Sequence, residues 1–159
     1  MAILRFFMLL SLVVWVGGIM FFAFVLAPTV FSVLPTRALA GTVVNRALPI
    51  LHWMGILSGI VFLGTSIAYS RMTVGHAEPF AARNLLIVLM IVLTLISQFG
   101  IGAKLAVLRA DMGEELDRLP HDDARRVQFN KLHVWSTRLE GSILFFGLAV
   151  LFLTARRLS

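Results

Sequence analysis

The polar residues that lie deep inside the apolar segments of this sequence are the ones whose types could do chemistry. They are His52, Gln98, Arg138 and Glu140. Counted from Arg46, Lys104 and Lys131, at the ends of apolar runs, these four lie six to nine residues inward. At 1.5 Å per helical residue, they fall in roughly one 10 Å layer. An ionisable residue inside a membrane helix is costly and by default marks a functional site, so we predict one polar pocket built from this set.

Helical spacing indicates which of these side chains face one another. His133 and Glu140 are seven residues apart and share a helix face, whereas Arg138 points about 200° away from Glu140 around the same helix. His52 shares its face with two glycines, where a neighbouring helix can approach closely. We therefore expect His52 or Gln98 to contact Glu140. Arg138 is expected to reach loop carbonyls, lipid headgroups or Gln98.

Three interpretations of these residues remain open. In a structural one, Arg138 extends toward headgroups, His133 lies in the interface, and His52 is a hydrogen-bonded core histidine. In a second, His52 and His133 ligate a metal ion or haem, since imidazoles are suitable ligands. That site would have no His-Glu-x-x-His spacing and no cysteine to complete it. In a third, Glu140 and a histidine form a transport or proton-coupled pocket.

Four long apolar segments must position these residues. No charged residue occurs from Phe6 to Thr36, and further charge-free intervals cover 47–70, 84–103 and 141–155. The last interval is short, and extending it back to residue 132 places Arg138 and Glu140 inside the membrane. Hydrophobic residues make up 59% of the chain and charged residues 14%, far from the averages of soluble domains. The first segment is too long for the apolar part of a signal peptide, so we keep it as a helix.

These segments predict an all-α membrane protein with a single domain over residues 1–159. We expect an up-and-down four-transmembrane-helix bundle, with helices at about 3–27, 36–70, 82–118 and 121–156 and both termini on one side. Helices 2, 3 and 4 are predicted to extend beyond the bilayer on the other side, because apolar stripes continue among charged residues there. We expect the extensions to pack on one another and to bury Val43, Leu108, Met112 and Val127.

Small residues predict where the helices approach most closely, because backbones can meet where side chains are absent. The helix-packing residues that we predict are Trp15, Gly17, Gly18, Gly55 and Gly59. Packing within the bundle is the first interpretation, and a homo-oligomer seam is the alternative. Pro49 is expected to kink helix 2 and to release the carbonyl of Asn45 from its helical hydrogen bond.

Several short motifs resemble those of a known family. They are Trp15-Val-Gly-Gly, Ala27-Pro28, Phe31, Ala40-Gly41 and the segment from Lys131 to Glu140. In them the chain resembles uncharacterised bacterial four-helix membrane proteins that share a domain with human transmembrane protein 205. More distantly, it is similar to the copper resistance protein D and protoporphyrinogen oxidase membrane families. Those haem proteins use a histidine in helix 1, which this helix lacks, so haem ligation is not carried over. The closer resemblance implies the architecture, a link to handling of metals or metal-containing drugs, and no particular reaction.

From these observations we expect an integral membrane protein with an accessory role or a role in handling a small solute or metal. A haem- or copper-binding redox protein and a purely structural or oligomerising subunit are the alternatives. We expect no cofactor and no enzyme activity of the soluble kind, because phosphate-binding loops and nucleophile elbows are missing. The expected partners are the lipid bilayer and either a second copy or another membrane subunit, and not nucleic acid. The resemblance implies a bacterial cytoplasmic membrane, and the excess of basic residues beside loops 1 and 3 favours their lying in the cytoplasm.

Overall fold

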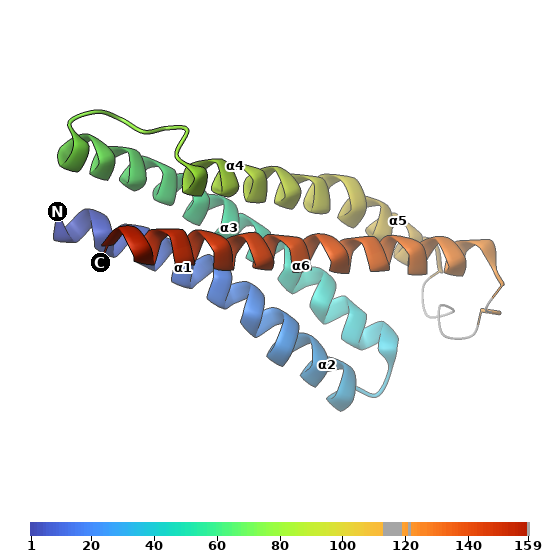
Figure 1. Cartoon of the computed structure of the whole chain (residues 1–159). Helices are drawn as coiled ribbons and strands as arrows, with labels where there is room; N and C mark the ends of the chain where they lie inside the picture. The colour runs from blue at the N-terminus through green and yellow to red at the C-terminus, as the bar shows by residue number, and fades with distance from the viewer. Residues whose placement is uncertain (113–118, 121, 159) are drawn as a thin grey trace.

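The computed structural model describes residues 1–112, 119–120 and 122–158. Within them the chain forms four helical rods, each long and apolar enough to cross a membrane, and no strand (Figure 1). The bounds are α1 (Ala2–Phe21), η1 (Phe22–Leu26) and α2 (Ala27–Val33) for the first rod, α3 (Arg37–Val74) for the second, α4 (Ala82–Leu95), η2 (Ile96–Gly102) and α5 (Ala103–Met112) for the third, and α6 (Ala124–Leu158) for the fourth. The two chain ends lie at one end of the bundle, so the predicted membrane fold is confirmed.

The helix α3 is longer than the hydrocarbon core of a bilayer is thick. Its 38 residues extend over about 57 Å at 1.5 Å per residue, while the hydrocarbon core is about 30 Å thick. The helix begins where the Thr36 hydroxyl accepts a hydrogen bond from the N–H of Leu39, at 3.2 Å. It ends at Gly75, whose φ of +83° is the left-handed conformation that glycine adopts without strain.

Two π-helical stretches interrupt the rods, and the sequence patterns did not predict either of them. In η1 the N–H of Ala27 donates to the carbonyl of Phe22, and this wider turn carries the helix past Pro28, which has no N–H of its own. The first rod therefore continues to Val33, beyond the predicted end near residue 27. The second stretch, η2, interrupts the third rod at the depth of the predicted polar pocket.

The first and second rods pack closely around Trp15, whose side chain is 2% exposed. A Cβ added at Gly55 would lie 2.7 Å from Cε2 of this indole, and one added at Gly59 would lie 2.7 Å from Cζ3. Leu51 occupies the space beside Gly18, because a Cβ added there would lie 2.8 Å from a methyl group of this leucine. Gly17 has no atom within 4 Å of its Cβ position, so it does not share the predicted packing role.

The helix extensions meet beyond the far ends of the spans through part of the predicted set. Met112 is buried there and Leu108 is half-buried, while Val43 and Val127 remain 40% and 51% exposed. Arg109 of α5 connects the extensions by donating to the carbonyl of Gly41 in α3 and lying over the Phe129 ring of α6. The predicted extension of helix 3 over 113–118 and the predicted start of helix 4 at residue 121 lie outside the described residues; α6 is described from Ala124.

Candidate functional site

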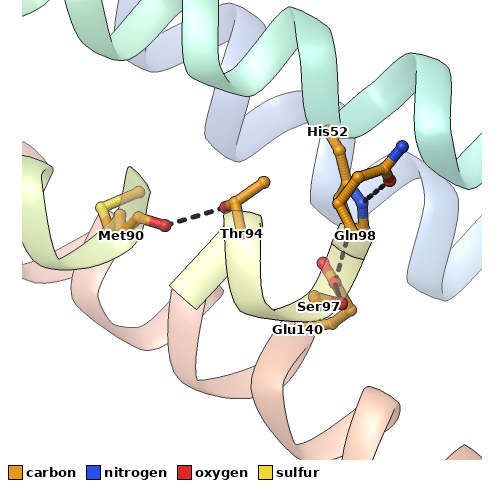
Figure 2. A network of polar contacts seen from close by, with 6 residues as sticks. All are labelled: His52, Met90, Thr94, Ser97, Gln98 and Glu140. Atoms are coloured by element: carbon orange, nitrogen blue, oxygen red, sulfur yellow. Dashed lines mark hydrogen bonds and ion pairs between the residues drawn. The ribbon is translucent and has the colours of Figure 1, made fainter. Parts of the chain in front are cut away.

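A buried polar cluster centred on His52 joins three of the four rods (Figure 2). The Nδ1 atom of His52, on α3, lies 2.6 Å from Oε1 of Gln98 on η2, and its Nε2 atom lies 2.8 Å from Oε1 of Glu140 on α6. The Ser97 hydroxyl donates to the same Glu140 oxygen at 3.0 Å. The side chains of His52 and Glu140 are only 4% and 15% exposed, so this pair is held mainly by protein contacts.

The two nitrogens of His52 allow the cluster two protonation states. As a cation, His52 donates from both nitrogens, to the Gln98 amide oxygen and to the Glu140 carboxylate. As a neutral ring it has one N–H, and the other nitrogen must accept, which the Gln98 amide satisfies by turning its NH₂ group toward the ring. The cluster can therefore take up or release a proton while both ring nitrogens of His52 keep a partner.

The π-helical stretch explains how two neighbouring residues of one helix both reach this cluster. Just before η2, the Thr94 hydroxyl donates to the carbonyl of Met90 at 2.8 Å, a back-bond that tends to bend a helix (Figure 2). In η2 itself the wider turn directs Ser97 and Gln98 inward together. Such π-turns often occur at functional sites, because they redirect side chains at a cost in backbone regularity.

Two cavities flank the cluster. The inner cavity, about 220 Å³ in volume, is bounded by Pro49, His52, Gln98 and Gly102, among others. The lateral cavity, about 240 Å³, is bounded by Phe22, Ala27, Arg109, His133 and Glu140, among others. Both have Asn45 and Ser136 in their walls, so they lie next to each other. The backbone carbonyl of Asn45 is a further acceptor in this region, because Pro49 has no N–H to form the helical hydrogen bond with it.

The structure does not bring Arg138 to the predicted pocket. Its guanidinium lies over the ring of Trp135, 5.5 Å from the ring centre, and the side chain is exposed. Glu140 points to the opposite side of α6, as the angle of about 200° between the two residues requires. The pocket is therefore formed by His52, Gln98 and Glu140 together with Ser97, which the sequence reasoning did not include.

His133 lies in the wall of the lateral cavity and stacks on Phe129, with an interplanar angle of 3°. His52 has different partners, so the two histidines proposed as ligands are engaged separately. Among the residues that the structure describes, no group of three or more His, Asp or Glu side chains is arranged to hold a metal ion.

Two arginines that the sequence predicts only as charges beside the membrane turn inward in the structure. Arg109 is half-buried in the lateral cavity, as described above. Arg83 lies at the opposite end of the bundle, 5% exposed, and donates to the hydroxyls of Ser66 at 2.8 Å and Ser70 at 3.1 Å. Ser66 and Ser70 are four residues apart and share a helix face, and this spacing was the sequence signal that could have predicted the Arg83 contact.

The fold and the site together define a four-helix membrane bundle with a buried histidine–carboxylate pair. A sequence profile described as "Domain of unknown function (DUF4149)" matches residues 10–114, and the chain belongs to that family. The match includes His52 and Gln98 and leaves out α6, which carries Glu140. It provides no link to the transmembrane protein 205 or copper resistance protein D families. No curated protein matches the chain. No solved structure matches it either.

Proposed function

We propose that this membrane protein handles a small solute in the pocket around His52, Gln98 and Glu140, and that the solute changes the protonation of the His52–Glu140 pair. The observation that carries the proposal is the position of the pair between two cavities. An ionisable pair kept at this depth, with space for a guest beside it, is the arrangement found in substrate and proton pathways.

The energetics of the pair support a proton-linked role. In a low-dielectric interior, the attraction between a charged histidine and a carboxylate is opposed by the loss of their hydration, so the balance between the ion pair and the neutral pair depends on the other groups nearby. A polar or charged guest nearby can then change which state is favoured. Among the described wall residues of the two cavities, the charged or titratable ones are His52, Arg109, His133 and Glu140.

A comparison of neighbouring substitutions on α6 tests the proposal. The protein would be placed in phosphatidylcholine nanodiscs, native mass spectrometry would detect a retained small molecule, and infrared difference spectroscopy would follow carboxyl protonation. Glu140→Gln should lose the molecule and the carboxyl signal. Arg138→Gln should behave as the wild type, because this exposed side chain lies outside the pocket. If Glu140→Gln keeps the molecule, or if the wild type shows no carboxyl signal when the molecule is bound, the proposal is wrong.

We also propose that the bundle lies in a bacterial cytoplasmic membrane, with the α2–α3 and α5–α6 connections in the cytoplasm. The sidedness is supported by the excess of lysine and arginine beside those connections, which the positive-inside rule associates with the cytoplasmic face. The role that suits a chain of this size is that of an accessory or small-solute-handling subunit, acting alone or with a second copy or another membrane protein.

A further inference from the structure

The lateral cavity has two walls of opposite character. The wall from the first rod is apolar and is formed by Ile19, Phe22, Ala23, Ala27 and Phe31. The wall from α6 carries His133, Ser136, Thr137 and Glu140. These spacings of three and four residues place each set on one face of its helix. A guest that fills this cavity must therefore be amphipathic.

Arg109 gives the polar side a fixed positive charge. One guanidinium nitrogen donates to the carbonyl of Gly41, and the guanidinium carbon lies 5.4 Å from the centre of the Phe129 ring. A Cβ at position 41 would lie 2.9 Å from the guanidinium carbon, so the absence of a side chain there makes room for the arginine. Guanidinium has five N–H donors, and within the described part of the chain no carboxylate pairs with Arg109. An anionic group in the cavity would meet donors that are already oriented.

The cavity is not closed where its wall includes Phe31 of α2 and Thr137 of α6. Phe31 is 47% exposed at this side, and Thr137 is also exposed, so neither side chain closes the opening. The volume of about 240 Å³ is slightly below the usual range of roughly 300–1,000 Å³ for ligand pockets. It suits a compact organic acid or one end of a longer amphiphile.

We propose that the lateral cavity binds an amphipathic organic anion, which enters between α2 and α6. Its carboxylate or phosphate is held by Arg109, and its apolar body lies against Phe22 and Ala27. This inference rests on the proposed function, since it names the chemical class of the solute that reaches Glu140. Carboxylate and phosphate share the chemistry that guanidinium recognises through paired N–H donors.

Three ten-carbon probes test the proposal in nanodiscs of phosphatidylcholine: decanoate, decyl phosphate and uncharged decanol. Binding of each would be measured by calorimetry. We expect decanoate, decyl phosphate or both to bind at least about tenfold more tightly than decanol, because the charge-assisted hydrogen bonds are lost with the alcohol. Tighter binding of decanoate would indicate a free acid as the natural guest, and tighter binding of decyl phosphate would indicate a phosphate headgroup.

Substitutions separate the site from general attraction to the membrane. Arg109→Gln should weaken anion binding about tenfold or more, Arg109→Lys should restore part of it, and Ala27→Phe should block the cavity while Arg109 remains. Arg138→Gln removes an exposed cation from α6 and should leave binding unchanged. Equal binding of decanol and the anions, equal effects of Arg109→Gln and Arg138→Gln, or no binding of either anion to the wild type would overturn this inference. None of these outcomes affects the Glu140→Gln comparison, which tests the proposed function separately.

Discussion

Replacing Glu140 by leucine should destabilise the bundle by removing the partner of a buried histidine. The carboxylate oxygen Oε1 accepts hydrogen bonds from Nε2 of His52, at 2.8 Å, and from the hydroxyl of Ser97, at 3.0 Å. Leucine offers neither, and His52, 4% exposed, cannot turn to water. Breaking a buried pair from one side costs about 3–5 kcal/mol, and an unsatisfied neutral donor costs about 1–3 kcal/mol. Because Glu140 keeps slight exposure, we expect a loss of about 3 kcal/mol.

Three companion variants test the physical reason for that loss. Glu140→Gln keeps an amide oxygen as acceptor and should cost less than about 1 kcal/mol. The double variant His52→Leu with Glu140→Leu should recover most of the stability, since apolar replacements of a buried pair are often neutral or stabilising. Arg138→Leu is the control on the exposed side of α6. The assay is equilibrium unfolding in mixed micelles followed by tryptophan fluorescence. A Glu140→Leu variant as stable as the wild type would refute the reasoning.

Three further predictions concern packing, pH and topology. Gly55→Ala should lower the free energy of unfolding by about 1–3 kcal/mol, because its Cβ would meet the Trp15 ring. Gly64→Ala, with nothing within 4 Å of its Cβ position, should be neutral or stabilising. Equal changes in the free energy of unfolding for the two variants would contradict the predicted contact. Hydrogen bonds from the Arg125 side chain and backbone N–H hold the pKa of Asp123 below its usual value, so the stabilisation of the α6 start by Asp123 is present at neutral pH. It should disappear as pH falls below about 4, and hydrogen exchange of this turn in Asp123→Ala and wild type should converge there. Reporter fusions in the α2–α3 and α3–α4 connections should give opposite signals, and equal signals would exclude the four-span topology.

The contact between His52 and Glu140 was predictable to a useful degree, because depth and helical phase are properties of the sequence. Residue counts from Arg46, Lys104 and Lys131 place the polar residues in one layer, and the spacing of His133 and Glu140 indicates the inward face of the last helix. The same phase argument separates Arg138 from Glu140, as the structure shows. Ser97 was missed because a small hydroxyl within an apolar run has no distinctive pattern.

The sequence by itself determined the four spans, their up-and-down order and the approximate depth of the polar layer. Each depends on local quantities: the length of an apolar run, the positions of charges and a rise of 1.5 Å per residue. Only the tertiary structure decided that Arg109 turns inward to Gly41 while Arg138 turns outward, and that η2 directs Ser97 and Gln98 together. The first outcome depends on which backbone carbonyl lies within reach of each arginine side chain. The second depends on the partners that α3 and α6 offer to the side chains of the widened turn. Both are set by contacts between residues distant in the chain, which periodicity along one helix does not record.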